Sequence, residues 1–156
     1  MAVERSNVSS DLVWQITRTQ NAFLVKRKTA GGSQFSRDPL NVLNKHSFKY
    51  AGYANTKAVG VQATENGVVL ITKKPATSQQ PAKSIATVSY GPGASTRKIY
   101  KGVAGKTAKN GYRADLREEA VARVSAIRRS QKAKKDTPAR KPRGAQAKKA
   151  AEQDSE

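Results

Sequence analysis

Lysine and arginine are the residues through which this chain has the most chemistry to offer. From Arg128 to Lys149 there are ten such residues against one acid, Asp136, interleaved with Ala, Pro, Gln and Gly. This segment has almost no apolar side chain to bury, so the entropy of the chain is unopposed. We therefore expect residues 131–156 to be a disordered basic tail that awaits a polyanion, and nucleic acid is the obvious polyanion.

The same excess of positive charge extends over the whole chain. Its 156 residues include 30 Lys and Arg against 11 Asp and Glu, which gives a formal net charge of +19 and an isoelectric point near 10.5. A globular enzyme would suffer the self-repulsion of this charge, whereas phosphate groups would neutralise it. Residues 1–90 and 91–156 are both basic, so the sequence predicts contact surfaces outside the tail.

Residues that could support catalysis or bind a metal are few. Cysteine is absent and His46 is the only histidine, which excludes disulfides and thiolate sites and makes a zinc site close to impossible. No motif for a Ser or Cys nucleophile is present, so we expect His46 to be a surface polar residue and not a catalytic base. No cofactor is expected, and neither a signal peptide nor a membrane span is predicted.

The segment Gly102 to Thr107, GVAGKT, is similar to a phosphate-binding P-loop. The full motif requires a glycine five residues before Gly105, where Tyr100 stands, and no strong strand precedes it. ATP binding is therefore disfavoured.

The first element that positions the basic residues is predicted to be a short helix. Ser9 or Ser10 can cap it, and Leu12, Val13 and Ile16 then lie on one side. The β-branched content of this stretch makes a strand the competing interpretation.

Four strands are expected after this helix. Alternation of side chains or apolar runs place them at residues 22–28, 47–52, 57–63 and 68–73. Asn66-Gly67 between the last two is a hairpin signal, because both residues tolerate positive φ, so the sheet is expected to be antiparallel. The loop between the first and second strands is long enough to suggest a functional loop.

Aromatic residues in the second predicted strand have two interpretations. Phe48, Tyr50 and Tyr53 lie in a basic stretch and could stack on bases, as in sheet-based RNA-binding domains. Aromatic residues at alternate strand positions are more often core, and we favour the core for Phe48 and Tyr50.

A second helix is predicted from about Ser95, after an irregular connector that contains three prolines. Ile99, Tyr100 and Val103 lie on one side of this helix, and Asn110-Gly111 supplies its stop.

The third helix, from about Asp115 to Gln131, is the best specified. Asp115 is expected to cap it, with Glu118 three residues on in a capping box. Its apolar stripe has spacings of four, four and three, its rims are cationic, and Glu119 and Arg123 can pair along it. In an ordinary domain such a basic face is simply solvated, but the charge of the whole chain favours a binding face. The stripe consists of Leu116, Ala120, Val124 and Ile127.

Together these elements predict an α+β fold. It has an N-terminal helix, a small antiparallel four-stranded sheet, two basic helices and a disordered basic C-terminal tail. We expect an N-terminal α+β domain (1–74), an irregular connector (75–94), a basic helical segment packed on the domain or on RNA (95–130), and the tail (131–156).

The chain contains, in this order, the segments DLVWQ (11–15), FLVKR (23–27), HSFKYAG (46–52), KAVGV (57–61), GVVLITK (67–73), YRADLR (112–117) and SAIRRSQK (125–132). In sequence and order these segments resemble the eukaryotic large-subunit ribosomal protein twenty-eight family. The resemblance runs from about residue 10 to residue 132, and it departs from the family in residues 91–111 and in the Ala-rich tail. It implies a small α+β domain without catalysis that lies among ribosomal RNA segments on the large subunit.

The resulting hypothesis is a structural ribosomal protein that binds folded ribosomal RNA by phosphate neutralisation and shape. It would act in the cytoplasmic ribosome after assembly in the nucleolus, beside neighbouring ribosomal proteins, without a membrane and not as a homo-oligomer. A nuclear ribosome-assembly factor with a similar N-terminal domain is the first alternative, a chromatin protein of linker-histone type the second, and an enzyme the third. The candidate RNA contacts are Lys26, Arg27, Lys28, Lys49, Arg97, Lys98, Lys101, Arg113, Arg117, Arg123, Arg128, Arg129, Lys132, Lys134, Lys135, Arg140, Lys141 and Arg143.

Overall fold

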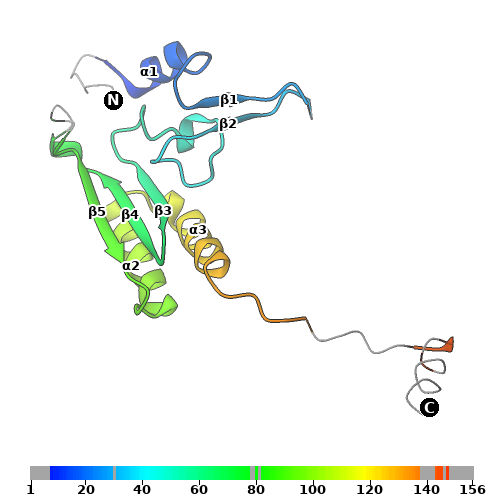
Figure 1. Ribbon diagram of the computed structural model, residues 1–156. Coiled ribbons are helices and arrows are strands. Elements are labelled where there is room, and N and C mark those ends of the chain that lie inside the picture. The colour runs from blue at the N-terminus through cyan, green and yellow to red at the C-terminus, as the bar shows by residue number, and fades with distance from the viewer. Residues whose placement is uncertain are drawn as a thin grey trace.

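The protein is an α+β structure built on a three-stranded antiparallel sheet (Figure 1). The structure is a computed structural model that describes residues 8–29, 31–77, 80, 82–137, 143–145 and 147. The sheet has the order β3-β4-β5, with β3 at Val59–Thr64, β4 at Gly67–Lys73 and β5 at Ile85–Tyr90. Helices α2 (Thr96–Ala108) and α3 (Arg117–Ser130) pack against each other and cover one face of it.

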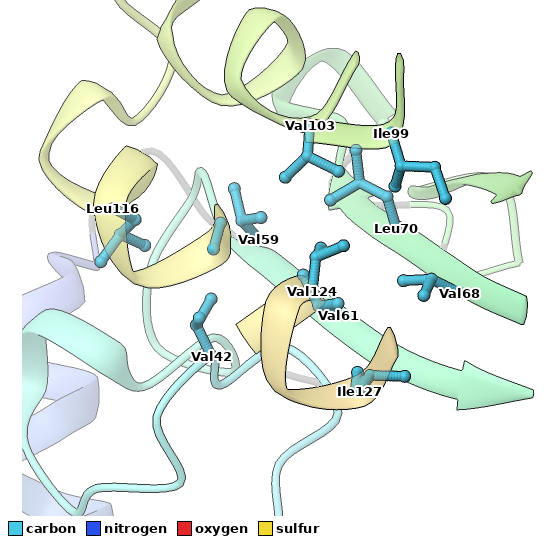
Figure 2. Close-up of a cluster of buried hydrophobic side chains, with 11 residues drawn as sticks. Val42, Val59, Val61, Val68, Leu70, Ile99, Val103, Leu116, Val124 and Ile127 are labelled. Carbon is cyan, nitrogen blue, oxygen red and sulfur yellow. The ribbon is translucent and has the colours of Figure 1, made fainter. Parts of the chain in front are cut away.

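The main core lies between this face and the two helices (Figure 2). Val68 and Leu70 of central β4 are fully buried there, whereas Val69 and Ile71 point to the opposite face and pack near Leu40. A strand covered on both faces reads as a continuous apolar run, which is how GVVLITK appears in the sequence. The helices contribute Ile99, Val103, Ala120, Val124 and Ile127, and Leu116 and Val42 complete the layer.

The loop that covers the second face approaches the sheet closely. A Cβ atom at Gly60 would overlap the carbonyl of Pro39, and one at Gly52 would overlap Leu40. Asp38 is buried in this loop, where its carboxylate accepts hydrogen bonds from the backbone N–H groups of Leu40 and Tyr53, and burial raises its pKa. Glycine is thus required at two positions to let the loop reach the sheet.

A smaller unit stands beside the main sheet. Strands β1 (Leu24–Lys26) and β2 (Gln34–Ser36) form an antiparallel hairpin that projects from the domain, and helix α1 (Ser10–Thr17) lies next to it (Figure 1). Ser9 caps α1 by accepting a hydrogen bond from the N–H of Leu12 at 3.2 Å, so the predicted helix is confirmed. Trp14 attaches it through ring contacts with His46, Phe48 and Tyr53.

The helix and hairpin predictions around the main sheet are confirmed. Ser95 caps α2, and this helix ends before Asn110 and Gly111, which have φ values of 57° and 60°. Residues 57–63 and 68–73 correspond to β3 and β4, and the pair Thr64 and Gly67 closes their hairpin. The two-residue turn is therefore Glu65-Asn66, one residue earlier than predicted, and neither Asn66 nor Gly67 has a positive φ.

The single four-stranded sheet is wrong, because the five strands form two sheets. Residues 47–52 contain not a strand but the 3₁₀ turn η1 (Phe48–Tyr50), since the Asn55 side chain donates to the carbonyls of Phe48 and Ala51 and holds the backbone in a turn. The long loop contains β2, which pairs with β1 over three residues. The predicted connector at 75–94 contains the turn η2 (Pro75–Thr77) and strand β5, which pairs with β4 over six residues.

The capping box predicted for the third helix is also wrong, although the predicted apolar stripe is buried as expected. Two 3₁₀ turns, η3 (Lys109–Gly111) and η4 (Ala114–Leu116), lead into α3, and the N-cap residue is Leu116. Asp115 lies within η4 and pairs with Arg113 at 2.9 Å instead. Glu119 pairs with Lys49 at 3.2 Å and not with Arg123.

The chain after α3 leads away from the domain (Figure 1). Residues 132–137 are exposed and belong to no helix or strand. Most of the tail predicted at 131–156 lies outside the described residues.

Candidate nucleic-acid interface

Most of the predicted RNA contacts that the structure describes are exposed, and the exposed ones lie mainly on three surfaces. The first surface is the β1–β2 hairpin, with Lys26, Arg27 and Lys28. The second is the outer face of α2, with Arg97, Lys98 and Lys101. The third is α3 and the chain after it, with Arg117, Arg129, Lys132, Lys134 and Lys135. Arg143 is exposed as well, whereas Arg140 and Lys141 lie outside the described residues.

The basic residues of the hairpin surface lie at the end of β1, where the chain leaves the strand to turn back. Gly31 and Gly32, with φ values of 72° and 78°, turn the chain beyond them, and glycine adopts this conformation without steric cost. Lys26 donates to the carbonyl of Thr19 at 3.1 Å, which fixes its side chain along the hairpin. Arg27 and Lys28 follow Lys26 directly after β1 and are exposed, in the hairpin that projects from the domain (Figure 1).

The α2 surface follows from which side of the helix is buried. Ile99, Val103 and Thr107 face the core at spacings of four, so Lys98 and Lys101 lie outside the buried stripe. The Thr107 hydroxyl donates to the carbonyl of Val103 at 2.6 Å. The GVAGKT segment is therefore ordinary helix, and its backbone N–H groups do not form a phosphate-binding loop.

Arg113 was predicted to contact RNA, but in the structure it holds the domain together. Its guanidinium donates to the carbonyls of Lys57 and Lys49 at 2.8 Å each and to both carboxylate oxygens of Asp115. The side chain is 14% exposed, and its hydrogen bonds lower the pKa of the Asp115 carboxyl. Arg113 thus joins the segment before α3 to η1 and to the residues that precede β3, which leaves few of its donors for a phosphate.

Lys49 and two arginines of α3 are partly engaged with the fold. The Lys49 ammonium donates to the Glu119 carboxylate, which raises the pKa of Lys49, and the Tyr50 hydroxyl donates to the same oxygen. Arg128 is half-buried and donates to the carbonyl of Pro92 at 3.4 Å. Arg123 is half-buried too, and its Nε atom and that of Arg128 are buried without a hydrogen-bond partner. Lys49 and Arg128 are therefore only partly available to a phosphate.

A further group of lysines was not among the RNA contacts predicted from the sequence. Lys57, Lys106 and Lys109 surround a hollow of about 400 Å³ between the end of α2 and the sheet, beside Tyr112. The Tyr112 hydroxyl donates to the carbonyls of Ala58 and Lys73, and the Lys57 ammonium lies 6.0 Å from the ring centroid. Lys106 stands in the last turn of α2 and Lys109 is its C-cap residue, and cations near the C-terminus of a helix are a local signal that could have identified them. Lys57 could not have been identified, since only the tertiary fold brings it near α2.

The aromatic residues for which base stacking was considered, Phe48, Tyr50 and Tyr53, do not form a free stacking platform. Tyr50 packs against the main core, as favoured from the sequence, while Phe48 joins Trp14 and Tyr53 in the half-buried cluster under α1. The ring of His46 lies 4.9 Å from that of Trp14, so His46 serves packing. Within the described residues no cluster of three potential metal ligands exists, and no helix is long and apolar enough to cross a membrane.

The comparison with known protein families decides the class. Residues 12–130 match the Ribosomal L28e protein family. The chain belongs to this family. The resemblance seen in the sequence is thereby confirmed, and the class is that of a ribosomal protein and not of an enzyme. The match ends at Ser130, which is also the last residue of α3.

Individual relatives of the family extend over most of the chain. The large ribosomal subunit protein eL28 of Schizosaccharomyces pombe is 50% identical over 131 residues, which are 83% of this chain and 97% of that protein. The protein of the same name from Dictyostelium discoideum is 34% identical over 134 residues, 86% of this chain and 97% of that protein. That from Caenorhabditis elegans is 38% identical over 96 residues, 60% of this chain and 74% of its own length.

The structural role of Arg113 predicts a loss of stability on substitution. Arg113→Ala should lower the free energy of unfolding by roughly 1.5–3 kcal/mol, since hydrogen bonds to charged groups contribute about that much and two backbone carbonyls would lose a partner. Urea unfolding followed by circular dichroism measures the change. Arg129→Ala, an exposed substitution on α3, is the matched control and should stay within about 0.5 kcal/mol of the unaltered protein. Equal stability of the two variants would contradict the structural role.

Proposed function

We propose that this protein is a structural constituent of the large subunit of the eukaryotic cytoplasmic ribosome and binds folded ribosomal RNA there. The observation that carries the proposal is the distribution of Lys and Arg side chains over three exposed surfaces of a ribosomal-protein fold. Two relatives that are named as large-subunit proteins support it, because the similarity covers nearly the whole length of each.

The mechanism we infer is neutralisation of backbone phosphates by Lys and Arg. Double-stranded RNA has a deep, narrow major groove that side chains do not read, so a protein recognises it by the positions of its phosphates and 2′-hydroxyls. The fold fixes the relative positions of the Lys and Arg residues on α2, on α3 and on the projecting hairpin. Such an arrangement can match one RNA shape, whereas a flexible segment with the same charge cannot.

Contacts with neighbouring ribosomal proteins are the second part of the proposal. Leu12 and Ile16 on α1 are 49% and 68% exposed, and Phe35 on β2 is 46% exposed. Leu12 and Ile16 lie one turn apart on the same side of α1, and contiguous exposed apolar side chains mark protein interaction surfaces. We expect the protein to enter the ribosome as a single copy, with assembly beginning in the nucleolus.

Sedimentation in a sucrose gradient tests this function. Tagged full-length protein should follow large subunits and translating ribosomes in a cytoplasmic extract and should remain with them after the nuclear fraction is removed. An assembly factor would instead be confined to nuclear precursors of the subunit. Protein found only in those precursors would overturn the proposal and favour that alternative.

A further inference from the structure

A hollow of about 710 Å³ lies between α2 and α3. Ile99 and Val103 of α2, with Ala120 and Val124 of α3, are turned into the core, so the hollow opens on the outer side of the helix pair. Its size falls within the range of about 300–1,000 Å³ that is typical of small-molecule sites. It is thus large enough for a unit the size of one nucleotide.

The lining combines an aromatic ring with small side chains. Tyr100 and Val121 are half-buried, pack against the main core and also line the hollow. Ala104 of α2 and Ala122 of α3 also line the hollow, and their short side chains occupy little of the space. The phenol ring of Tyr100 is therefore a stacking surface that the fold holds in place.

Three cations line the hollow together with this ring. Arg97 lies one turn before Tyr100 on α2, Lys101 directly follows Tyr100, and Arg117 comes from α3. All three are exposed, and none of them is in an ion pair within the described part of the chain. The hollow is therefore adapted to a flat ring that carries a negative group at its edge.

Glu118 is the one acid among the residues that line the hollow. Within the described residues its carboxylate has no ion pair, and an ionised carboxylate only accepts hydrogen bonds. A site for phosphate alone, or for an acidic peptide, would be weakened by this group. A nucleobase with an amino group would satisfy it.

We propose that this hollow holds one unpaired nucleotide of the bound ribosomal RNA, with its base stacked on Tyr100 and its phosphate between Arg97, Lys101 and Arg117. The inference rests on the proposed function, since the other basic surfaces must hold the RNA. Glu118 accepts from the amino group of adenine, cytosine or guanine, whereas uracil has no amino group. The protein thus reads one looped-out base in addition to the shape of the RNA.

The test uses the full-length protein and RNA hairpins that differ at a single bulged nucleotide. Fluorescence anisotropy at one salt concentration compares bulged A, C, G and U with an uninterrupted duplex. Hairpins with A, C or G should bind about tenfold more tightly than the duplex, since stacking of one base on an aromatic side chain supplies an effect of this size. The hairpin with U should bind more weakly than the other three, and Glu118→Ala, which removes the acceptor, should abolish that difference.

Matched substitutions separate the hollow from general charge. Lys101→Gln should reduce the preference for a bulge over a duplex, whereas Lys98→Gln removes the same charge from α2 outside the hollow and should leave the preference unchanged. Tyr100→Leu should abolish the preference, and Tyr100→Phe should retain it. If Tyr100→Leu lowers the melting temperature, a second measurement uses the unaltered protein and an RNA hairpin with 2-aminopurine at the bulged position. Binding should quench the fluorescence of 2-aminopurine, because this base would stack on Tyr100.

The outcomes distinguish the inference from the function on which it rests. Equal affinity for bulged and paired RNA, or unquenched 2-aminopurine, would overturn the inference and leave RNA binding intact. A glutamate-rich peptide that displaces bulged RNA and depends on Tyr100 would also overturn it, since the hollow would then serve a protein partner. Failure to bind any of the RNAs would overturn the proposed function itself.

Discussion

Val124→Asp should destabilise the protein by more than about 3 kcal/mol, because it places an unpaired carboxylate in the main core. Val124 is fully buried between the helices and the sheet (Figure 2). Domains of this size are stable by about 5–15 kcal/mol in total, so much of the protein would be unfolded at moderate temperature. Thermal and urea unfolding measure the effect.

Ser125→Asp is the matched control for this substitution. Ser125 is the next residue of α3 and is exposed, so the same carboxylate there remains solvated, and the free energy of unfolding should change by no more than about 0.5 kcal/mol. If Ser125→Asp proved the more destabilising of the two, the orientation of α3 on the sheet would be wrong.

The largest effect is expected from salt on RNA binding. If about six to ten phosphates are neutralised, the affinity for a ribosomal RNA fragment should fall by about 10³–10⁵ between 50 and 200 mM salt, since bound counterions are released on association. The three surfaces carry enough exposed Lys and Arg residues for that number of phosphate contacts. Filter binding over a salt series measures the fall.

Arg113→Ala provides the control for that series. Its guanidinium is engaged with two carbonyls and a carboxylate, so the slope of log affinity against log salt should be unchanged in conditions where the variant is folded. A decrease of less than tenfold for the unaltered protein would show that phosphate contacts are not the main source of affinity.

The helices and the central hairpin could be predicted from the sequence because their signals are local. The stripe Leu116, Ala120, Val124 and Ile127 has the period of a helix, and each of the four is buried. Ser9 and Ser95 act as caps, and the Asn110-Gly111 stop has the left-handed backbone that these residues adopt most easily. Each of these features depends on residues within a few positions in the chain.

The remaining elements depend on partners that are distant in the sequence. The sequence of strand β5 lies between two prolines and shows only a weak alternation of apolar and polar residues. Its pairing with β4 stabilises it as a strand. The turn at Phe48–Tyr50 depends on the side chain of Asn55, which captures two carbonyls. Asp115 fits a cap by position, but Arg113 captures its carboxylate. In each case a contact made by the fold overrides the local pattern.

The candidate interface divides in the same way. That Arg97, Lys98 and Lys101 are exposed follows from the helical period once Ile99 and Val103 are known to be buried. That Arg113 is structural, and that Arg97, Tyr100 and Arg117 meet around one hollow, follows only from how α2 packs on α3. Composition thus indicates a phosphate-binding protein, and tertiary packing determines which bases are available.

A salt series with three proteins tests the central claim most directly. The full chain is compared with a protein ending at Ser130 and with a full-length variant in which Arg97, Lys98 and Lys101 are replaced by Gln. Thermal melts check that all three are folded. Each lost phosphate contact should reduce the slope of log affinity against log salt by roughly 0.7–0.9, so both altered proteins should give flatter slopes. The shortened protein should keep its preference for ribosomal over unrelated structured RNA, because the folded surfaces carry the shape match. Slopes that match the full chain in both altered proteins would contradict binding by phosphate neutralisation.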